Sequence, residues 1–369
     1  MKHISLRFLC GMLVAIALGL SNATAAVPAG TAPNPAAEKT ESKGPDLAKK
    51  VQVFILMGQS NMFGMGHIAP ATTDGTLEHA VQVEKKYPYL VGPDGTWTTF
   101  PGVRNVQVMM RNNQMSVLHN EWLSVKGRTI GPEFGIAHYV GDSLDAPVML
   151  LKSCIGNRSL GWDLLPPGSK GYDFTEKDPK TGQDVVYTYA GYKESPMRWE
   201  KGTEPQKIGW YAGKQYDDDT ADAKKVLADL DQYYPGAKGY EIAGFFWWQG
   251  EKDCGDAGHA SHYEQNLVHL IKQLRHDFNA PKAKFVLATL GEAAKGCTGN
   301  EGQVLEAQLA VDGNSGKYPE FKGNVATVYS HPLSHGGSGN SHYNGNAETY
   351  MDLGEAMGKA MLDLLKNEQ

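Results

Sequence analysis

Basic clusters, long apolar runs and cysteines are all scarce in this chain of 369 residues. Lysine and arginine number 35 against 41 acidic residues, for a formal net charge of −6, and no basic stretch suggests a nucleic-acid surface. No apolar run reaches the roughly 20 residues that span a bilayer. We therefore expect neither a nucleic-acid partner nor a membrane-spanning segment.

The N-terminal segment 1–25 predicts an export signal. Lys2 and Arg7 come before or at the start of the apolar run 8–20, and Ala-Thr-Ala at 23–25 provides the small residues of a cleavage site. The run is too short to be a bilayer anchor. We expect a secreted or periplasmic protein with no membrane attachment once the signal is removed.

Four cysteines are present, and removal of the signal takes Cys10 with it. Of the remaining Cys154, Cys254 and Cys297, one pair can form a disulfide in an oxidising compartment. Cys254 and Cys297 both follow predicted strands and are the candidate pair. The spacing does not resemble a zinc site, and we expect no cofactor.

Residues 26–49 are rich in Ala, Pro, Lys and Glu without apolar periodicity, which is typical of a flexible linker. The folded domain is expected over 50–366, where strands and helices alternate. Apolar runs predict buried strands at 51–57, 147–153, 242–248, 284–290 and 325–330. Helical patterns cover 132–140, 220–234, 263–278, 304–311 and 350–364.

This alternation predicts an α/β fold: a three-layer, doubly wound, five-stranded parallel sheet flanked by helices, with flavodoxin-like topology. Ligands of such sheets bind beyond the carboxyl ends of the strands. Two segments, 67–130 and 157–215, are long and rich in Gly, Pro and aromatic residues. We interpret them as loop insertions around the mouth of a site.

Two motifs follow the first two predicted strands. Ser60 lies in Gly-Gln-Ser-Asn-Met at 58–62, directly after the first strand, where a turn can expose its hydroxyl and a backbone N–H. Gly156 lies in Ser-Cys-Ile-Gly-Asn at 153–157, after the second strand. Taken alone, Ser60 is more typical of a helix cap, and Gly156 is equally typical of an ordinary turn.

Two further motifs complete the set. Gln249 and Glu251 follow the third strand in Trp-Trp-Gln-Gly-Glu-Lys-Asp, and His342 precedes the last helix. Histidine is the usual general base near neutral pH. The pair His259 and His262 has metal-like spacing, but no third ligand is evident, so we expect no metal.

The order of these motifs resembles the SGNH hydrolase superfamily. Within it, the chain is similar to the sialate O-acetylesterase-like branch, which includes the acetyl xylan esterases of carbohydrate esterase family six. The resemblance covers about residues 51–366, and the segments 58–62 and 248–251 are its most specific parts. The final block, His342 to Asn344 followed by Leu353 and Gly354, also matches.

The resemblance implies a serine carboxylic-ester hydrolase in which Ser60 attacks an acetyl carbonyl and His342 takes its proton. It implies an oxyanion hole made by the backbone N–H groups of Ser60 and Gly156 and by the side chain of Gln249. The substrate class is an acetylated oligo- or polysaccharide. The candidate substrate-binding residues are Asn61, Asn157, Arg158 and Trp162.

One departure from the family concerns the acid of the triad. Many members carry Asp three residues before the histidine, where this chain has Gly339. We expect Glu251 to orient His342 instead, with Asp253 as the second candidate. A Ser–His pair whose imidazole is held by a backbone carbonyl is the third alternative.

Two other functions stay open: a glycan-binding relative without catalysis, and an esterase or lipase for hydrophobic substrates. The rings of several aromatic residues in the segment 157–215 suit a glycan-binding wall or, equally, a small core of their own: Trp162, Tyr172, Tyr187, Tyr192, Trp199 and Trp210. The sequence favours the carbohydrate O-acetylesterase.

Overall fold

The computed structural model describes residues 45–178 and 180–366. The predicted signal segment and most of the predicted linker lie outside the described residues. Linker residues 45–49 lie beside the domain, where Lys49 Nζ contacts Asp145 at 2.5 Å. Among the described helices, none is long and apolar enough to cross a membrane.

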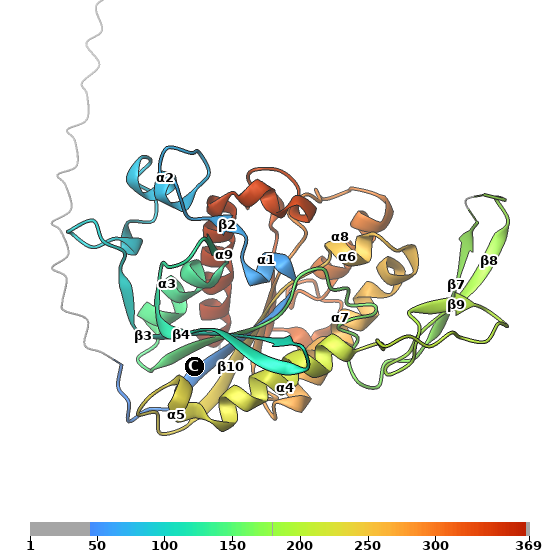
Figure 1. Cartoon of the computed structure of the whole chain (residues 1–369), viewed down its shortest axis with the longest axis horizontal. Coiled ribbons are helices and arrows are strands. Elements are labelled where there is room, and N and C mark those ends of the chain that lie inside the picture. Colours follow the sequence, from blue (N-terminus) through green and yellow to red (C-terminus); the bar gives the residue numbers. More distant parts are fainter. Residues whose placement is uncertain (1–44, 179, 367–369) are drawn as a thin grey trace, which may run out of the picture. The chain divides into compact units, whose positions relative to one another are not determined.

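A seven-stranded sheet forms the centre of the fold (Figure 1). Its strands, from one edge to the other, are β12 (Val325–Val328), β11 (Lys284–Ala288), β10 (Tyr240–Trp248), β1 (Val51–Gly58), β6 (Val148–Ser153), β3 (Thr99–Arg111) and β4 (Gln114–Ser124). All neighbouring strands pair in parallel except β3 and β4. The five predicted strands are confirmed, and their order is flavodoxin-like, with the switch point between β1 and β10.

The prediction that 67–130 is a loop insertion is wrong for β3 and β4, which extend the sheet from five strands to seven. They form a hairpin whose turn residues, Asn112 and Asn113, have φ of 49° and 59°. Asparagine tolerates this left-handed backbone, which suits a two-residue hairpin turn. The rest of the segment holds β2 (Gly66–His67) paired with β5 (Thr129–Ile130), α2 (Leu77–Gln82) and a 3₁₀ turn at Pro88–Leu90.

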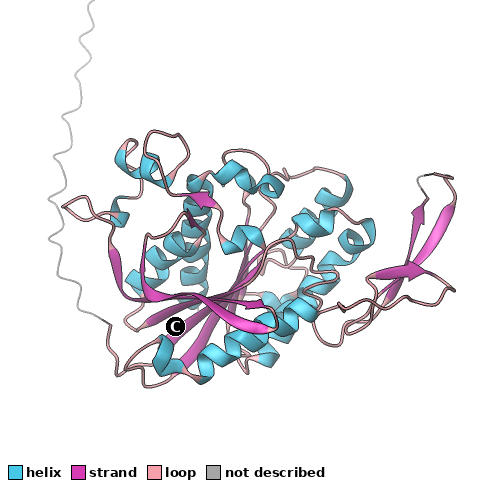
Figure 2. Ribbon diagram, viewed as in Figure 1, coloured by secondary structure: helices cyan, strands magenta, loops and turns pink. Residues whose placement is uncertain are grey.

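Helices cover both faces of the sheet, giving the predicted three layers (Figure 2). One face packs against α3 (Glu133–Ser143) and α9 (Ala347–Lys366). The other packs against α4 (Lys214–Ala228), α7 (Ala257–Asp277) and α8 (Gly299–Ala310), with α5 (Leu230–Tyr233) after a break at Asp229.

The central strand β1 explains why its sequence is a continuous apolar run. Val53, Ile55 and Met57 point into the core on the side of α4, α7 and α8, while Phe54 and Leu56 point into the core on the side of α3 and α9. All five are at most 1% exposed. Because both faces are covered, alternation between apolar and polar residues is absent.

The second insertion carries a small antiparallel sheet of its own: β7 (Tyr172–Lys177), β8 (Asp184–Tyr189) and β9 (Arg198–Glu200). Figure 1 shows these strands projecting beyond α7. At the base of the insertion, Trp162, Trp199 and Trp210 gather in a separate apolar cluster. These three tryptophans therefore do build a core of the insertion.

The cysteines that remain after the predicted signal are unpaired. Cys154, Cys254 and Cys297 are all free thiols in the structure, so the candidate disulfide between the last two is not formed.

Candidate active site

Ser60 lies where β1 ends and the single-turn helix α1 (Ser60–Phe63) begins. The turn is tight: Gly58 has φ of 144°, and a Cβ there would stand 2.2 Å from the Trp248 carbonyl oxygen of neighbouring β10. Only glycine fits this close approach. The serine is thereby presented at the carboxyl edge of the sheet, beside the switch point.

His342 lies in the 3₁₀ segment Gly339–Gly345, just before α9. Its Nε2 is 2.8 Å from Ser60 Oγ, although 282 positions separate the two residues. The sequence-based expectation that these side chains meet is therefore met by the geometry. At this distance the hydroxyl and the imidazole share a hydrogen bond suited to proton transfer.

The backbone at the histidine is unusual. His342, Tyr343 and Asn344 have φ of 55°, 53° and 51°, a left-handed conformation that costs about 1–2 kcal/mol per non-glycine residue. Packing holds the segment in place, because the buried Tyr343 ring lies 5.9 Å from the Trp248 ring and 6.1 Å from the Tyr350 ring. Such strain is typical of functional sites.

Ser60 and His342 open onto a cavity of about 660 Å³. This volume is ordinary for a small-ligand site and large enough for an acetylated sugar. The other lining residues are Gln59, Gly156, Asn157, Ser159, Trp162, Asp163, Met197, Glu251, Lys252, Gly255, Asp256, His259, Gly339 and Asn340.

Gly156 lies directly beside the serine. A Cβ on Gly156 would stand 3.3 Å from Ser60 Cβ, so its backbone is in contact range of the serine side chain. Asn157 follows with φ of 58° and is exposed at the cavity. The placement suits the predicted use of the Ser60 and Gly156 N–H groups as oxyanion donors, which stays a prediction.

Gln249 is placed differently from the prediction. Its Nε2 donates to the Arg158 carbonyl at 2.9 Å and to Asp253 Oδ2 at 2.6 Å, and its Oε1 accepts from Tyr263 at 3.0 Å. The residue is fully buried and does not line the cavity. The prediction that its side chain donates to an oxyanion is wrong in this structure, because both amide hydrogens are already donated.

Asp253 is not bonded to the histidine either. Its buried carboxylate accepts from the backbone N–H groups of Leu160 and Gly161, both at 2.8 Å, and from Gln249. Burial raises its pKa. The prediction of Asp253 as an alternative triad acid is wrong in this arrangement, and the residue instead fastens the loop after Gly156.

Glu251 begins the short helix α6 (Glu251–Cys254), is buried, and lines the same cavity as the serine. Its Oε1 accepts from Asn61 Nδ2 at 2.6 Å, and its Oε2 accepts from Gln59 Nε2. Burial, followed by repulsion from Glu292, raises its pKa to about 7. Within the described part of the chain, His342 has its one hydrogen bond with Ser60, so neither the predicted Glu251 contact nor one to a backbone carbonyl is formed.

Two carboxyl groups lie in the space that an aspartate side chain at position 339 would enter. Gly339 N donates to Glu292 Oε2 at 2.9 Å. A Cβ on Gly339 would stand 2.6 Å from oxygens of both Glu292 and Glu251. Sequence reasoning missed Glu292, although it stands close after the fourth predicted strand, where the sheet-edge rule could have found it.

The four predicted substrate-binding residues divide into two pairs. Asn157 and Trp162 line the cavity. Asn61 is fully buried and bonded to Glu251 and Tyr350, which makes it part of the scaffold. Arg158 donates to Gln215 and stacks 5.0 Å over Trp210, outside the cavity lining, so the structure does not support Asn61 or Arg158 as substrate contacts.

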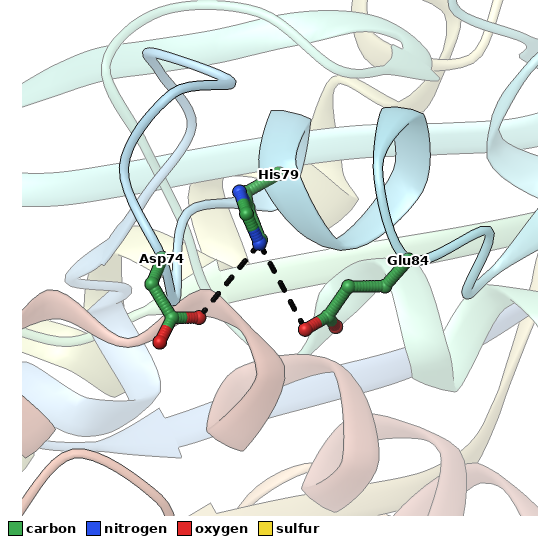
Figure 3. Close-up of side chains that lie close together, drawn as sticks. All are labelled: Asp74, His79 and Glu84. Atoms are coloured by element: carbon green, nitrogen blue, oxygen red, sulfur yellow. Dashed lines mark ion pairs between the residues drawn. The ribbon is translucent and has the colours of Figure 1, made fainter.

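One group of side chains in the described residues brings potential metal ligands together (Figure 3). His79 Nε2 stands 3.9 Å from both Asp74 Oδ1 and Glu84 Oε1, and its Nδ1 contacts the Ala71 carbonyl. Asp74 is 90% exposed, and Lys86 pairs with Glu84 at 2.9 Å. Lys86 would compete with a cation for Glu84, and none of these side chains lines the cavity of Ser60.

Comparisons with known proteins agree with the predicted resemblance. Residues 190–363 match the family model described as carbohydrate esterase, sialic acid-specific acetylesterase. A protein named "Probable carbohydrate esterase" from Arabidopsis thaliana is 37% identical over 73 residues, which are 20% of this chain and 26%, about a quarter, of that protein.

Two solved structures are also similar to the chain. NanS has a TM-score of 0.46 at 15% identity, covering 88% of this chain and 99% of its own. A carbohydrate acetylesterase from Xanthomonas citri has a TM-score of 0.45 at 13% identity, covering 84% of this chain and 55% of its own.

The segment matched by the family model contains Glu251 and His342, while Ser60 precedes it. By this match, residues 190–363 are similar to the sialic acid-specific acetylesterase family of carbohydrate esterases.

Proposed function

We propose that the protein is a secreted carbohydrate O-acetylesterase that releases acetate from acetylated glycans through an acetyl-enzyme. The observation that carries this proposal is the 2.8 Å contact between Ser60 Oγ and His342 Nε2 at a cavity of sugar size. The family match supports the general ester-hydrolase class.

In the first half of the reaction, His342 Nε2 takes the hydroxyl proton as Ser60 Oγ bonds to the acetyl carbonyl carbon. The backbone N–H groups of Ser60 and Gly156 stabilise the oxyanion. The imidazolium then gives its proton to the sugar oxygen as the ester bond breaks. The deacetylated sugar leaves and the acetyl group stays on Ser60.

In the second half, water replaces the sugar. His342 takes a proton from the water as the water oxygen attacks the acetyl carbonyl. The imidazolium then gives a proton to Ser60 Oγ as acetate leaves. No carboxylate bonded to His342 is needed for this proton balance. A dyad of this kind lacks the acid that orients the histidine. The rigid left-handed segment 342–344 instead holds the His342 ring in position against Ser60.

The export part of the proposal rests on the sequence alone. The basic start, the short apolar run 8–20 and the small residues 23–25 fit a cleaved signal. The protein would then act in the periplasm or outside the cell.

A glycan-binding protein without catalysis is the second candidate, and one observation favours it. His342 has no hydrogen bond to a carboxylate among the residues that the structure describes. Such a protein would bind acetylated sugars and release no acetate.

Acetate release separates the two candidates. We expect the wild-type protein to hydrolyse 4-nitrophenyl acetate and an acetylated glycan, and Ser60→Ala to lose at least about a thousandfold in kcat/KM, because the nucleophile is gone. Ser315→Ala, which removes an exposed hydroxyl outside the cavity lining, is the matched control and should keep full activity. Equal rates for wild type and Ser60→Ala would refute the assignment, and sugar binding without turnover would favour the second candidate.

A further inference from the structure

The cavity of Ser60 contains a second histidine that the proposed reaction does not use. His259 belongs to the first turn of α7 and is 2% exposed, yet it lines the cavity. Its ring is held in place: a Cβ on Gly161 would come within 2.6 Å of it, and the Tyr189 ring packs edge-on at 5.4 Å. The imidazole is therefore a fixed feature of the cavity wall.

Neither ring nitrogen of His259 has a hydrogen-bond partner within residues 45–178 and 180–366, and Nε2 is fully buried without one. A neutral imidazole carries one N–H donor and one acceptor nitrogen. Leaving such groups buried and unpaired costs free energy, so an unpaired group in a native structure needs an explanation.

The neighbouring polar groups, in contrast, are paired. Asp253 accepts three hydrogen bonds, and Asp256 accepts from Tyr189 at 2.9 Å and from the His259 backbone N–H at 3.0 Å. The imidazole thus stands out as a polar group in the cavity wall that lacks a protein partner. A ligand that enters the cavity can provide one.

The charges around the cavity indicate which ligand fits. The lining holds three carboxyl groups, those of Asp163, Glu251 and Asp256, and one exposed ammonium group, that of Lys252. Recognition of a sugar carboxylate would favour a guanidinium, because arginine binds carboxylates in a bidentate way. The cavity lining contains no arginine.

Two arginines, Arg198 and Arg158, lie close to lining carboxyl groups, and both already have protein partners. Arg198 donates to Glu176 at 2.5 Å and to Tyr189 at 2.6 Å, and lies 3.5 Å from Asp256. Arg158 donates to Gln215, stacks on Trp210 and lies 4.0 Å from Asp163. Both guanidinium groups therefore already face protein carboxyl groups, and the lining offers no free arginine to a sugar carboxylate, whereas uncharged hydroxyls can donate to the lining carboxyl groups and pair with the imidazole.

We infer that His259 is a specificity residue that binds a hydroxyl of an uncharged sugar, so that the cavity selects neutral acetylated sugars over acetylated sugar acids. Trp162 and Met197, which also line the cavity, offer apolar surface to the C–H face of the ring. The inference rests on the proposed esterase function and goes further by naming the substrate class of the site.

The test compares His259→Phe with wild type on three substrates: 4-nitrophenyl acetate, an O-acetylated neutral methyl glycoside and an O-acetylated sialic acid. Phenylalanine keeps the ring and removes both nitrogens. We expect the ratio of kcat/KM for the neutral glycoside to that for 4-nitrophenyl acetate to fall about 10- to 100-fold, mainly through KM, because one buried hydrogen bond to the sugar is lost.

His262→Phe is the matched control. It lies one helical turn further along α7, stacks on Tyr172 at a centroid distance of 3.4 Å and does not line the cavity, so its ratio should equal that of wild type. His259→Asn, which restores an N–H donor in a smaller side chain, should recover part of the ratio and guards against a folding defect of the Phe variant.

The outcomes distinguish the inference from the function beneath it. Wild-type preference for the neutral glycoside, together with a reduced ratio in His259→Phe, supports the inference. Wild-type preference for acetylated sialic acid, or a ratio unchanged in His259→Phe, overturns it while the esterase function stands. A wild-type protein that releases no acetate from any of the three substrates overturns the proposed function and the inference with it.

Discussion

Replacement of Glu251 by glutamine should change how the stability of the protein depends on pH. The carboxyl group is buried beside Ser60, and burial, together with the nearby Glu292, raises its pKa from 4.5 to about 7. Glutamine has almost the same shape as the protonated acid and cannot ionise. The substitution therefore removes one titration from the folded protein while largely preserving its packing.

The sign and size of the effect follow from linkage. Below about pH 4.5, Glu251 is protonated in both the folded and the unfolded chain, so it contributes no pH dependence to the free energy of unfolding. Between 4.5 and about 7 the unfolded chain ionises first, so the free energy of unfolding falls as pH rises. At about 1.4 kcal/mol per pH unit, this interval amounts to a loss of about 3 kcal/mol in wild type above pH 7.

The assay is urea unfolding of wild type and Glu251→Gln at about pH 5 and about pH 8. Glutamine still loses one hydrogen bond, because Gln59 and Asn61 both donate to this position, but that cost is similar at both pH values and cancels in the comparison. We expect the variant to gain about 3 kcal/mol relative to wild type between the two conditions. Glu204→Gln, at an exposed carboxylate, is the control and should gain nothing. The same pH dependence in wild type and Glu251→Gln would refute the reasoning.

Two further predictions concern the surroundings of the nucleophile. Lys152→Met should destabilise the protein by about 3–5 kcal/mol in chemical denaturation, because the 2.6 Å pair with Glu133 is buried and Lys152 also donates to the Phe63 carbonyl at 3.0 Å. A loss under about 1 kcal/mol would show that the pair is solvated. Gly339→Asp should lower both the melting temperature and acetate release, since its Cβ would collide with two carboxyl oxygens 2.6 Å away and add a third acid beside Glu292. A rise in kcat would contradict this and would mean that Asp restores a triad.

The sheet was predictable where the chain is uniformly apolar and not where its strands carry polar residues. The five strands buried on both faces produce continuous apolar runs. Strand β3 does not, because it contains Pro101 and Gly102 and buries Arg104, Asn105 and Gln107. Arg104 is accommodated by a hydrogen bond to the Tyr233 carbonyl, a partner 129 positions away that no local pattern reveals.

The site divides in the same way. The meeting of Ser60 and His342 could be predicted because parallel strands end at one edge of a sheet. The direction of the Glu251, Asp253 and Gln249 side chains could not, because it depends on partners from distant segments. The backbone N–H groups of Leu160 and Gly161 donate to Asp253. The Asn61 side chain donates to Glu251.

Trapping of the acetyl-enzyme tests the central claim most directly. Wild-type protein mixed with 4-nitrophenyl acetate is quenched in acid within one turnover, digested and analysed by mass spectrometry. The account predicts one acetyl group, carried by the peptide of Ser60 and absent when His342 is replaced by alanine. An acetyl group on any other side chain, or rapid acetate release with Ser60 never modified, would contradict it.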